Sequence, residues 1–75
     1  MPPVKHGRFT LNTEQSRLTK DNSSRYRLVV LDEWKNGQLT ETHRIELTEP
    51  VQQQVLLSLI NAVNSGKIQA RFLLP

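Results

Sequence analysis

Apolar and polar residues alternate most clearly over Arg25–Trp34, which predicts a β-strand because successive side chains of a strand point to opposite faces. Both alternating sets contain apolar residues. We assign the even-numbered positions to the core and the odd-numbered positions to a partly exposed face. The core set is Tyr26, Leu28, Val30, Asp32 and Trp34, and the outward set is Arg25, Arg27, Val29, Leu31 and Glu33.

The segment Lys35-Asn36-Gly37-Gln38 that follows predicts a β-hairpin, because Asn and Gly tolerate the positive φ angles of a tight turn. The return strand is expected over residues 39–47. Its inward set is Leu39, His43, Ile45 and Leu47, and its outward set is Thr40, Thr42, Arg44 and Glu46.

Two shorter strands are expected before the hairpin. Residues 8–12 alternate with Phe9 and Leu11 on one side, and residues 16–20 form a weaker segment that ends in a polar turn. Residues 1–7 contain two prolines and a glycine, so we expect a flexible N-terminal arm there.

A helix is predicted to begin at Pro50, with Glu49 or Thr48 as its cap, and to end near Ser65 before Gly66. Its apolar residues spread over half of the circumference, which is wider than a helix that covers only its own sheet needs. We therefore expect the helix to contact a second copy of the chain as well. The interface residues would be Val55, Leu56, Leu59, Ile60 and Val63.

Together these elements predict an α+β fold, an antiparallel meander of three to four strands followed by one C-terminal helix. The single domain is expected over residues 8–66. Residues 67–75 alternate again and are predicted to form either a last strand or an arm laid across a partner.

The chain has 75 residues and a formal net charge of +3, and a mildly basic domain favours polyanionic partners. A core of this size gives marginal stability, and the absence of cysteine excludes disulfides and thiolate metal sites. No apolar run is long enough to span a bilayer, and the first residues do not resemble a signal peptide. We expect a soluble cytoplasmic protein without membrane contact.

No enzymatic activity is expected, because the residues that carry chemistry are scattered. The serines lie in predicted turns or on a helix flank, and no glycine-rich phosphate loop is present. His6 and His43 have no metal-ligand spacing, and His43 is expected to be an interior or sheet-edge histidine. The sequence therefore predicts neither a metal nor a cofactor.

The outward face of the predicted sheet is basic. It holds five of the six arginines, whereas acidic residues are nearly absent because Glu33 and Glu46 lie at strand ends. Arginine binds phosphate through a planar fork and stacks on bases, so this face favours nucleic acid; a solvated polar face is the alternative interpretation. The set is Arg8, Thr10, Arg17, Thr19, Arg25, Arg27, Thr40, Thr42 and Arg44.

Three segments resemble the single-stranded-DNA-binding transcriptional coactivator family, that is, positive cofactor four and its bacterial and phage relatives. They are Phe9–Leu11, then Tyr26–Trp34 with its polar turn, and then Thr42–Leu47 followed directly by a helix with an acidic cap. The resemblance spans residues 8 to about 64. It implies a four-stranded antiparallel sheet backed by one helix, a dimer formed through that helix, and binding of single strands on the sheet.

By position, the resemblance also implies that Trp34 stacks on bases, which conflicts with the strand pattern that places Trp34 on the core face. The polar segment 16–20 and the tail 67–75 depart from the family pattern. The phosphate contacts that the resemblance implies are Arg17, Lys20, Arg25, Arg27, Lys35 and Arg44.

The resulting prediction is a homodimer that binds nucleic acid, single strands above all, with little sequence specificity. The alternative is a protein-interaction module or small regulatory subunit. Its contact surface would be the apolar stripe of the helix, Leu57 and the segment Phe72–Leu74, with the arginines serving solubility.

Overall fold

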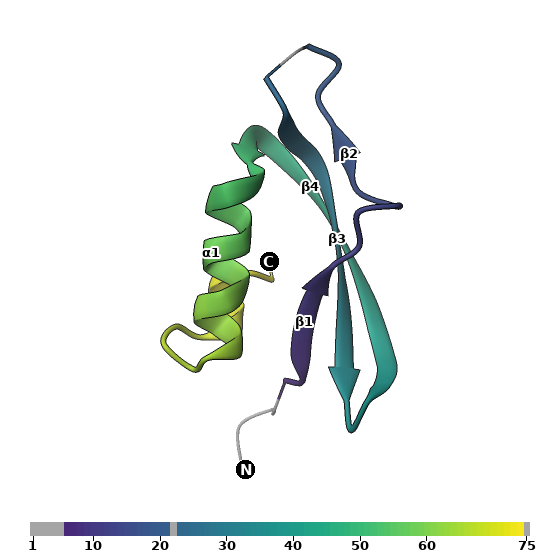
Figure 1. The fold of residues 1–75 in the computed structure, drawn as a ribbon, viewed down its shortest axis with the longest axis vertical. Helices are drawn as coiled ribbons and strands as arrows, with labels where there is room; N and C mark the ends of the chain where they lie inside the picture. The colour runs from purple at the N-terminus through teal and green to yellow at the C-terminus, as the bar shows by residue number, and fades with distance from the viewer. Residues whose placement is uncertain (1–5, 22, 75) are drawn as a thin grey trace.

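The computed structural model describes residues 6–21 and 23–74 and shows an antiparallel sheet followed by one C-terminal helix (Figure 1). The predicted α+β fold class is confirmed. The elements are β1 Arg8–Leu11, β2 Arg17–Leu18, β3 Arg25–Lys35, β4 Gln38–Gln52, α1 Gln53–Asn64 and the short 3-10 helix η1 Ala70–Phe72. Of the predicted N-terminal arm, residues 1–5 lie outside the described part of the chain.

Strand β3 is the centre of the sheet, since every other strand pairs with it in the antiparallel direction. β1 pairs with the C-terminal half of β3 and β2 with its N-terminal half, so the two short strands lie end to end along one edge. Between them, Ser16 is buried and its hydroxyl accepts a hydrogen bond of 2.9 Å from the Val30 N–H. β4 pairs along the other edge of β3.

The hairpin between β3 and β4 forms as predicted. Asn36 and Gly37 adopt φ angles of 52° and 75°, the left-handed values that a tight two-residue turn requires. One register shift, between Glu33 and Trp34, follows close to the turn, and beyond it the ladder is regular up to the pair Leu28–Glu46.

Strand β4 extends further than the expected range 39–47, and the predicted helix start at Pro50 is wrong. Val51 still pairs with Tyr26, and α1 begins at Gln53. Because β4 lies at an edge of the sheet, the missing N–H of Pro50 is tolerated within the strand.

The predicted assignment of the two faces of β3 is wrong over residues 28–34. Tyr26 does face α1 as expected, but a register shift between Tyr26 and Leu28 interrupts the alternation, as a β-bulge does. The face toward α1 therefore holds Val29, Leu31 and Glu33, and the opposite face, here named the open face, holds Leu28, Val30, Asp32 and Trp34. The pattern was ambiguous because both sets contain apolar residues.

The hydrophobic core lies between the sheet and α1 (Figure 1). Its buried residues are Phe9, Tyr26, Val29, Leu31, Leu56, Ile60 and Leu73. Two of the five helix residues expected at a partner interface, Leu56 and Ile60, thus serve the chain's own core, and Val63 packs against that core. Val55 and Leu59 are exposed.

The C-terminal tail folds back beside α1 instead of forming a strand. α1 ends at Asn64, close to the predicted end near Ser65, and Gly66 follows with a φ of 75°. The Lys67 N–H donates to the Ala62 carbonyl at 2.9 Å. In the described part of the tail, η1 is the only regular element. Leu73 then enters the core, whereas Phe72 is 64% exposed.

Candidate nucleic-acid interface

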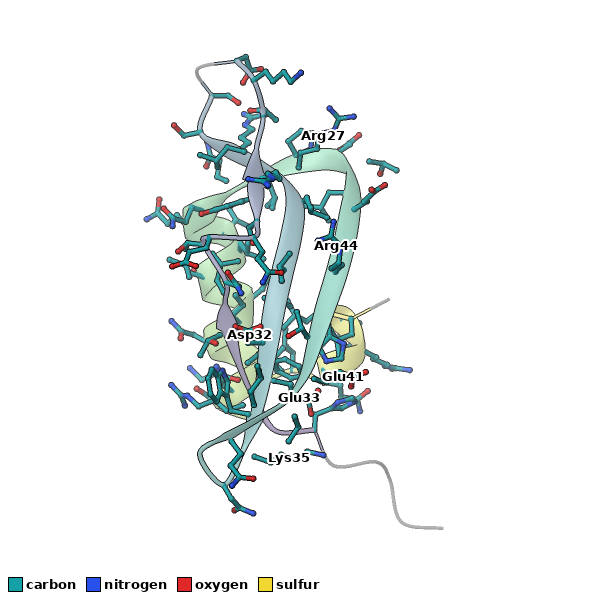
Figure 2. All side chains as sticks on the ribbon, turned by 90° about the vertical axis from the view of Figure 1, so that its right-hand side faces the viewer. Arg27, Asp32, Glu33, Lys35, Glu41 and Arg44 are labelled. Atoms are coloured by element: carbon teal, nitrogen blue, oxygen red, sulfur yellow. The ribbon has the colours of Figure 1, made fainter. Side chains whose placement is uncertain are left out.

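The open face of the sheet collects basic and hydroxyl side chains from several strands. Directly opposed residues of an antiparallel pair share a face. Arg8 lies opposite Trp34 and Arg44 opposite Val30, while Thr10 and Thr42 flank Asp32 on its two sides. Arg17 lies opposite Leu28. Figure 2 looks onto this face, with Arg27 and Arg44 toward one end and the hairpin residue Lys35 toward the other.

Trp34 lies on the open face, which corrects the expectation that it belongs to the core. Its indole Nε1 donates a hydrogen bond of 2.8 Å to the Thr10 hydroxyl, so the ring is held beside β1. The side chain is only half-buried. The conflict between the strand pattern and the stacking role is therefore removed, because the shift near Tyr26 reverses the parity on which the pattern relied.

A hollow of about 410 Å³ lies on this side of the sheet where β2 meets β3 and β4. Three cations line it, namely Arg17, Lys20 and Arg27, together with one carboxylate, Glu46. Leu18, Leu28 and Leu47 complete the lining. The balance of charge in the hollow is positive, which suits a phosphate group bound by guanidinium and ammonium donors.

Acidic residues are less scarce on the open face than the sequence predicted. Asp32 lies near its centre and accepts hydrogen bonds from the Thr42 hydroxyl at 3.1 Å and from the Asn12 amide at 3.3 Å. Glu46 borders the hollow, whereas Glu33 leaves this face for the buried one. Both differences have one cause: the predicted parity of β3 is reversed, so Asp32 lies on the open face and Glu33 on the face toward α1.

The remaining predicted contacts are spread over the two ends of β3. Arg25 lies opposite Gln52, at the end where β4 turns into α1. Lys35 lies at the hairpin, and its Nζ approaches the buried Glu33 at 3.9 Å. Within residues 6–21 and 23–74, no ion pair involves any arginine or Lys20. These cations are therefore available to an anionic ligand.

A second cluster of polar residues, which the sequence did not predict, lies on the face toward α1. Glu33 is 3% exposed and accepts a hydrogen bond of 2.8 Å from the Gly7 N–H. His43 Nε2 lies 2.8 Å from Glu33 Oε1 and 3.6 Å from Glu41 Oε2, and His6 Nδ1 lies 3.7 Å from Glu33 Oε2. The two histidines, distant in sequence, thus meet at one carboxylate.

Burial by itself would raise the pKa of Glu33. The hydrogen bonds from the Gly7 N–H and from His43, with the positive potential of the two histidines, outweigh burial and leave the pKa below its ordinary value. The sequence carries little signal for this cluster, because a regular Asn-Gly hairpin would pair Glu33 with Thr40. Only the register shift between Glu33 and Trp34 brings Glu41 opposite Glu33.

The comparisons with known proteins add no relative. No family model matches the chain, and no curated protein or solved structure is found to be similar to it. In the described residues, no helix is long and apolar enough to cross a membrane. The resemblance to the coactivator family therefore stays a prediction, and the function has to be argued from the site.

Proposed function

We propose that this protein binds single-stranded nucleic acid on the open face of its sheet, without catalysis and with little sequence specificity. One observation carries the proposal: Trp34 shares the face that α1 leaves uncovered with Arg8, Arg17 and Arg44, which have no ion-pair partner among the described residues. An aromatic ring stacks on any base, and arginines bind any phosphate, so such a face discriminates weakly between sequences.

The open face offers two subsites, one for a phosphate and one for a base. The hollow lined by Arg17, Lys20 and Arg27 takes a backbone phosphate, and Trp34 offers a stacking surface. Leu28, at the hollow, and Trp34 lie on the same strand about 20 Å apart at ~3.3 Å per residue. A bound strand would therefore run along β3 from the hollow toward the hairpin, passing Arg44 and Arg8 at the sides.

A homodimer completes the proposal. Within the described residues β4 pairs only with β3, so its long outer edge is open to a second strand. If two copies of β4 pair antiparallel about Ile45, Arg44 falls opposite Glu46 of the partner subunit, which makes the edge complementary in charge. Both helices then lie on one side of the joined sheet, and the two open faces become continuous.

The exposed apolar residues beside that edge favour the same contact. Val55, Leu59 and Phe72 are exposed, and Leu59 and Phe72 border an apolar groove of about 170 Å³ between β4, α1 and the tail. Ile45, Leu47 and Val51 of β4 also line this groove. Sedimentation equilibrium should therefore report a dimer, and Ile45→Lys, at the centre of the proposed pairing, should convert it to a monomer.

The binding proposal is tested by fluorescence anisotropy of a labelled oligothymidine, titrated at low and at physiological salt beside a duplex of the same length. We expect micromolar or tighter affinity that favours the single strand and falls with salt, because bound counterions are released from each neutralised phosphate. The double variant Arg17→Glu/Arg27→Glu should weaken binding by at least about tenfold.

The matched control carries the same change of charge away from the open face. Lys67→Glu/Arg71→Glu alters two exposed cations that follow α1 and should bind almost as the unchanged protein does. Circular dichroism establishes that both variants are folded. Equal losses in the two variants would reduce the effect to net charge, and absence of binding at low salt would refute the proposal.

A protein-interaction module is the second candidate, and the exposure of Val55, Leu59 and Phe72 is the observation that favours it. In that case the protein would not bind the oligothymidine at low salt. Phe72→Ser would then leave the isolated protein folded but abolish its complex with a protein partner. Nucleic-acid binding that is unchanged in Phe72→Ser supports the first proposal instead.

A further inference from the structure

The hairpin brings three groups of metal-ligating type together on the face toward α1. Glu33 lies opposite Glu41 in the ladder, and His43 is two positions further along β4, opposite Leu31. Residues two apart on a strand share a face, so all three side chains point the same way. One ligand atom from each of the three lies within 4.8 Å of the others. Glu33 and Glu41 are seen near each other, at the hairpin end of the sheet, in Figure 2.

The N-terminal segment holds the other carboxylate oxygen of Glu33. The Gly7 N–H holds Glu33 Oε2 at 2.8 Å, and the neighbouring His6 places its Nδ1 3.7 Å from the same oxygen. The ring centroid of Phe9 lies 5.9 Å from that of each imidazole. An apolar ring thus limits the movement of both imidazoles beside the carboxylate.

We propose that Glu33, Glu41 and His43 bind a divalent transition-metal ion, with a water molecule as the fourth ligand, and that Zn²⁺ is a suitable probe for the site. Imidazole nitrogen and carboxylate oxygen are ordinary zinc ligands, with bond lengths of about 2.0–2.2 Å. Ligand atoms at the corners of such a tetrahedron are ~3.3–3.6 Å apart.

The observed distances are close to that requirement. His43 Nε2 and Glu41 Oε2 are 3.6 Å apart, which already fits. His43 Nε2 and Glu33 Oε1 are 2.8 Å apart, a hydrogen-bond distance, so this pair has to open by about half an ångström when the metal replaces the shared proton. Glu41 is exposed and His43 half-buried, so the ion can enter from solvent.

The charges of the cluster favour a cation. Two carboxylates face one ammonium group, that of Lys35, which lies 3.9 Å from Glu33 Oε2 and is itself half-exposed. His43 is a neutral ligand when it binds a metal. A divalent ion therefore neutralises the charge of the two carboxylates and makes the burial of Glu33 less costly.

The site would act on stability. It joins β3 and β4, and a chain of 75 residues without cysteine has few other means of cross-linking. Binding to the folded state alone raises stability as the metal concentration rises. This role is independent of nucleic-acid binding, because the cluster lies on the opposite face of the sheet.

The proposal is tested by isothermal titration calorimetry of the untagged protein with ZnCl₂ near neutral pH. We expect about one Zn²⁺ per chain with micromolar affinity and a rise in melting temperature in the same buffer. Glu41→Gln removes an exposed ligand without disturbing the core and should lower the affinity at least about tenfold. Glu46→Gln, an exposed carboxylate on the open face of the same strand, is the matched control and should not change it.

A second measurement keeps the test independent of stability. Co²⁺ in a four-coordinate site absorbs visible light strongly, and His43→Gln should remove this absorption while its circular dichroism stays unchanged. The proposal as a whole fails if no Zn²⁺ binds at a hundred micromolar, or if Glu41→Gln and Glu46→Gln have equal effects.

Discussion

The open face of the sheet and the face toward α1 carry charged side chains in different environments, although both faces come from the same strands. On the open face, Arg8, Arg17 and Arg44 are exposed and have no ion-pair partner among the described residues. On the other face, Glu33 is almost fully buried and contacts Gly7 and His43.

The difference follows from the cost of burying charge. An exposed arginine is solvated by water and needs no partner, whereas a buried carboxylate is tolerated only if hydrogen bonds replace its hydration. The cations of the open face are therefore free to meet a ligand, and the buried cluster is organised before any ligand arrives. Substitutions on the two faces should consequently differ in kind: binding is affected on one, stability on the other.

The largest effect on stability is expected from Leu31→Ala. Leu31 is fully buried in the core against α1, and its truncation leaves a cavity that costs about 2–5 kcal/mol in the free energy of unfolding. Leu28→Ala, on the open face of the same strand, should cost less than about 1.5 kcal/mol because Leu28 is only partly buried. Urea denaturation measures both; similar losses would mean that the faces are buried alike.

Gly7→Ala should have the next largest effect on stability and lower the free energy of unfolding by about 1–3 kcal/mol. A Cβ at this position would overlap the Trp34 carbonyl oxygen and would lie 2.7 Å from Lys35 Cγ, so the segment must move and its N–H must leave Glu33. His6→Ala serves as the control, because it removes the neighbouring side chain and keeps the close approach of the backbone. If both variants unfold at the same urea concentration, the contact of Gly7 is not what holds this segment.

Replacing the buried carboxylate tests its hydrogen bonds. Glu33→Gln keeps the size of the side chain but leaves one oxygen in place of two, and should cost about 1–2 kcal/mol. Asp32→Asn, the neighbouring change on the open face, should cost under about 1 kcal/mol because Asp32 is only half-buried. Thermal denaturation of both proteins in the absence of metal decides this, and a larger effect of Asp32→Asn would reverse the comparison.

The smallest effects concern the titration of two carboxyls. The pKa of Asp21, in an exposed turn, is lowered from 3.8 to about 2 by hydrogen bonds from Ser23 and Thr19, and that of Glu33 is lowered below 4.5. In each case the folded pKa is the lower one, so the stabilisation is present above the unfolded pKa and is lost as the pH falls through the folded one.

Carbon-detected NMR of the carboxyl groups should therefore place the Asp21 midpoint at about pH 2. The acid dependence of the unfolding free energy should be weaker in Glu33→Gln, which lacks one of these titrations. A Glu33 midpoint above its ordinary value would show that burial outweighs the hydrogen bonds from Gly7 and His43.

Elements that depend on neighbouring residues were predicted well. The hairpin follows from Asn36 and Gly37, whose positive φ angles few other residue pairs adopt without strain, and Gly66 ends α1 for the same reason. The antiparallel sheet followed by a helix also follows from alternation and helical periodicity in the chain. Turns, strands and helices of this kind depend on residues that are close in the sequence, so local sequence patterns are enough to predict them.

The two faces of β3 were decided only by the assembled sheet. Leu28 and Val30 are as apolar as Val29 and Leu31, since each pair is one Leu and one Val, so either face could serve as the core. The register shift after Tyr26 makes the choice. That choice depends on how β4 pairs and where α1 packs, which are contacts between distant residues. Because it reverses the parity, it also places Trp34 beside the arginines and Glu33 beside the two histidines, and both candidate sites depend on it.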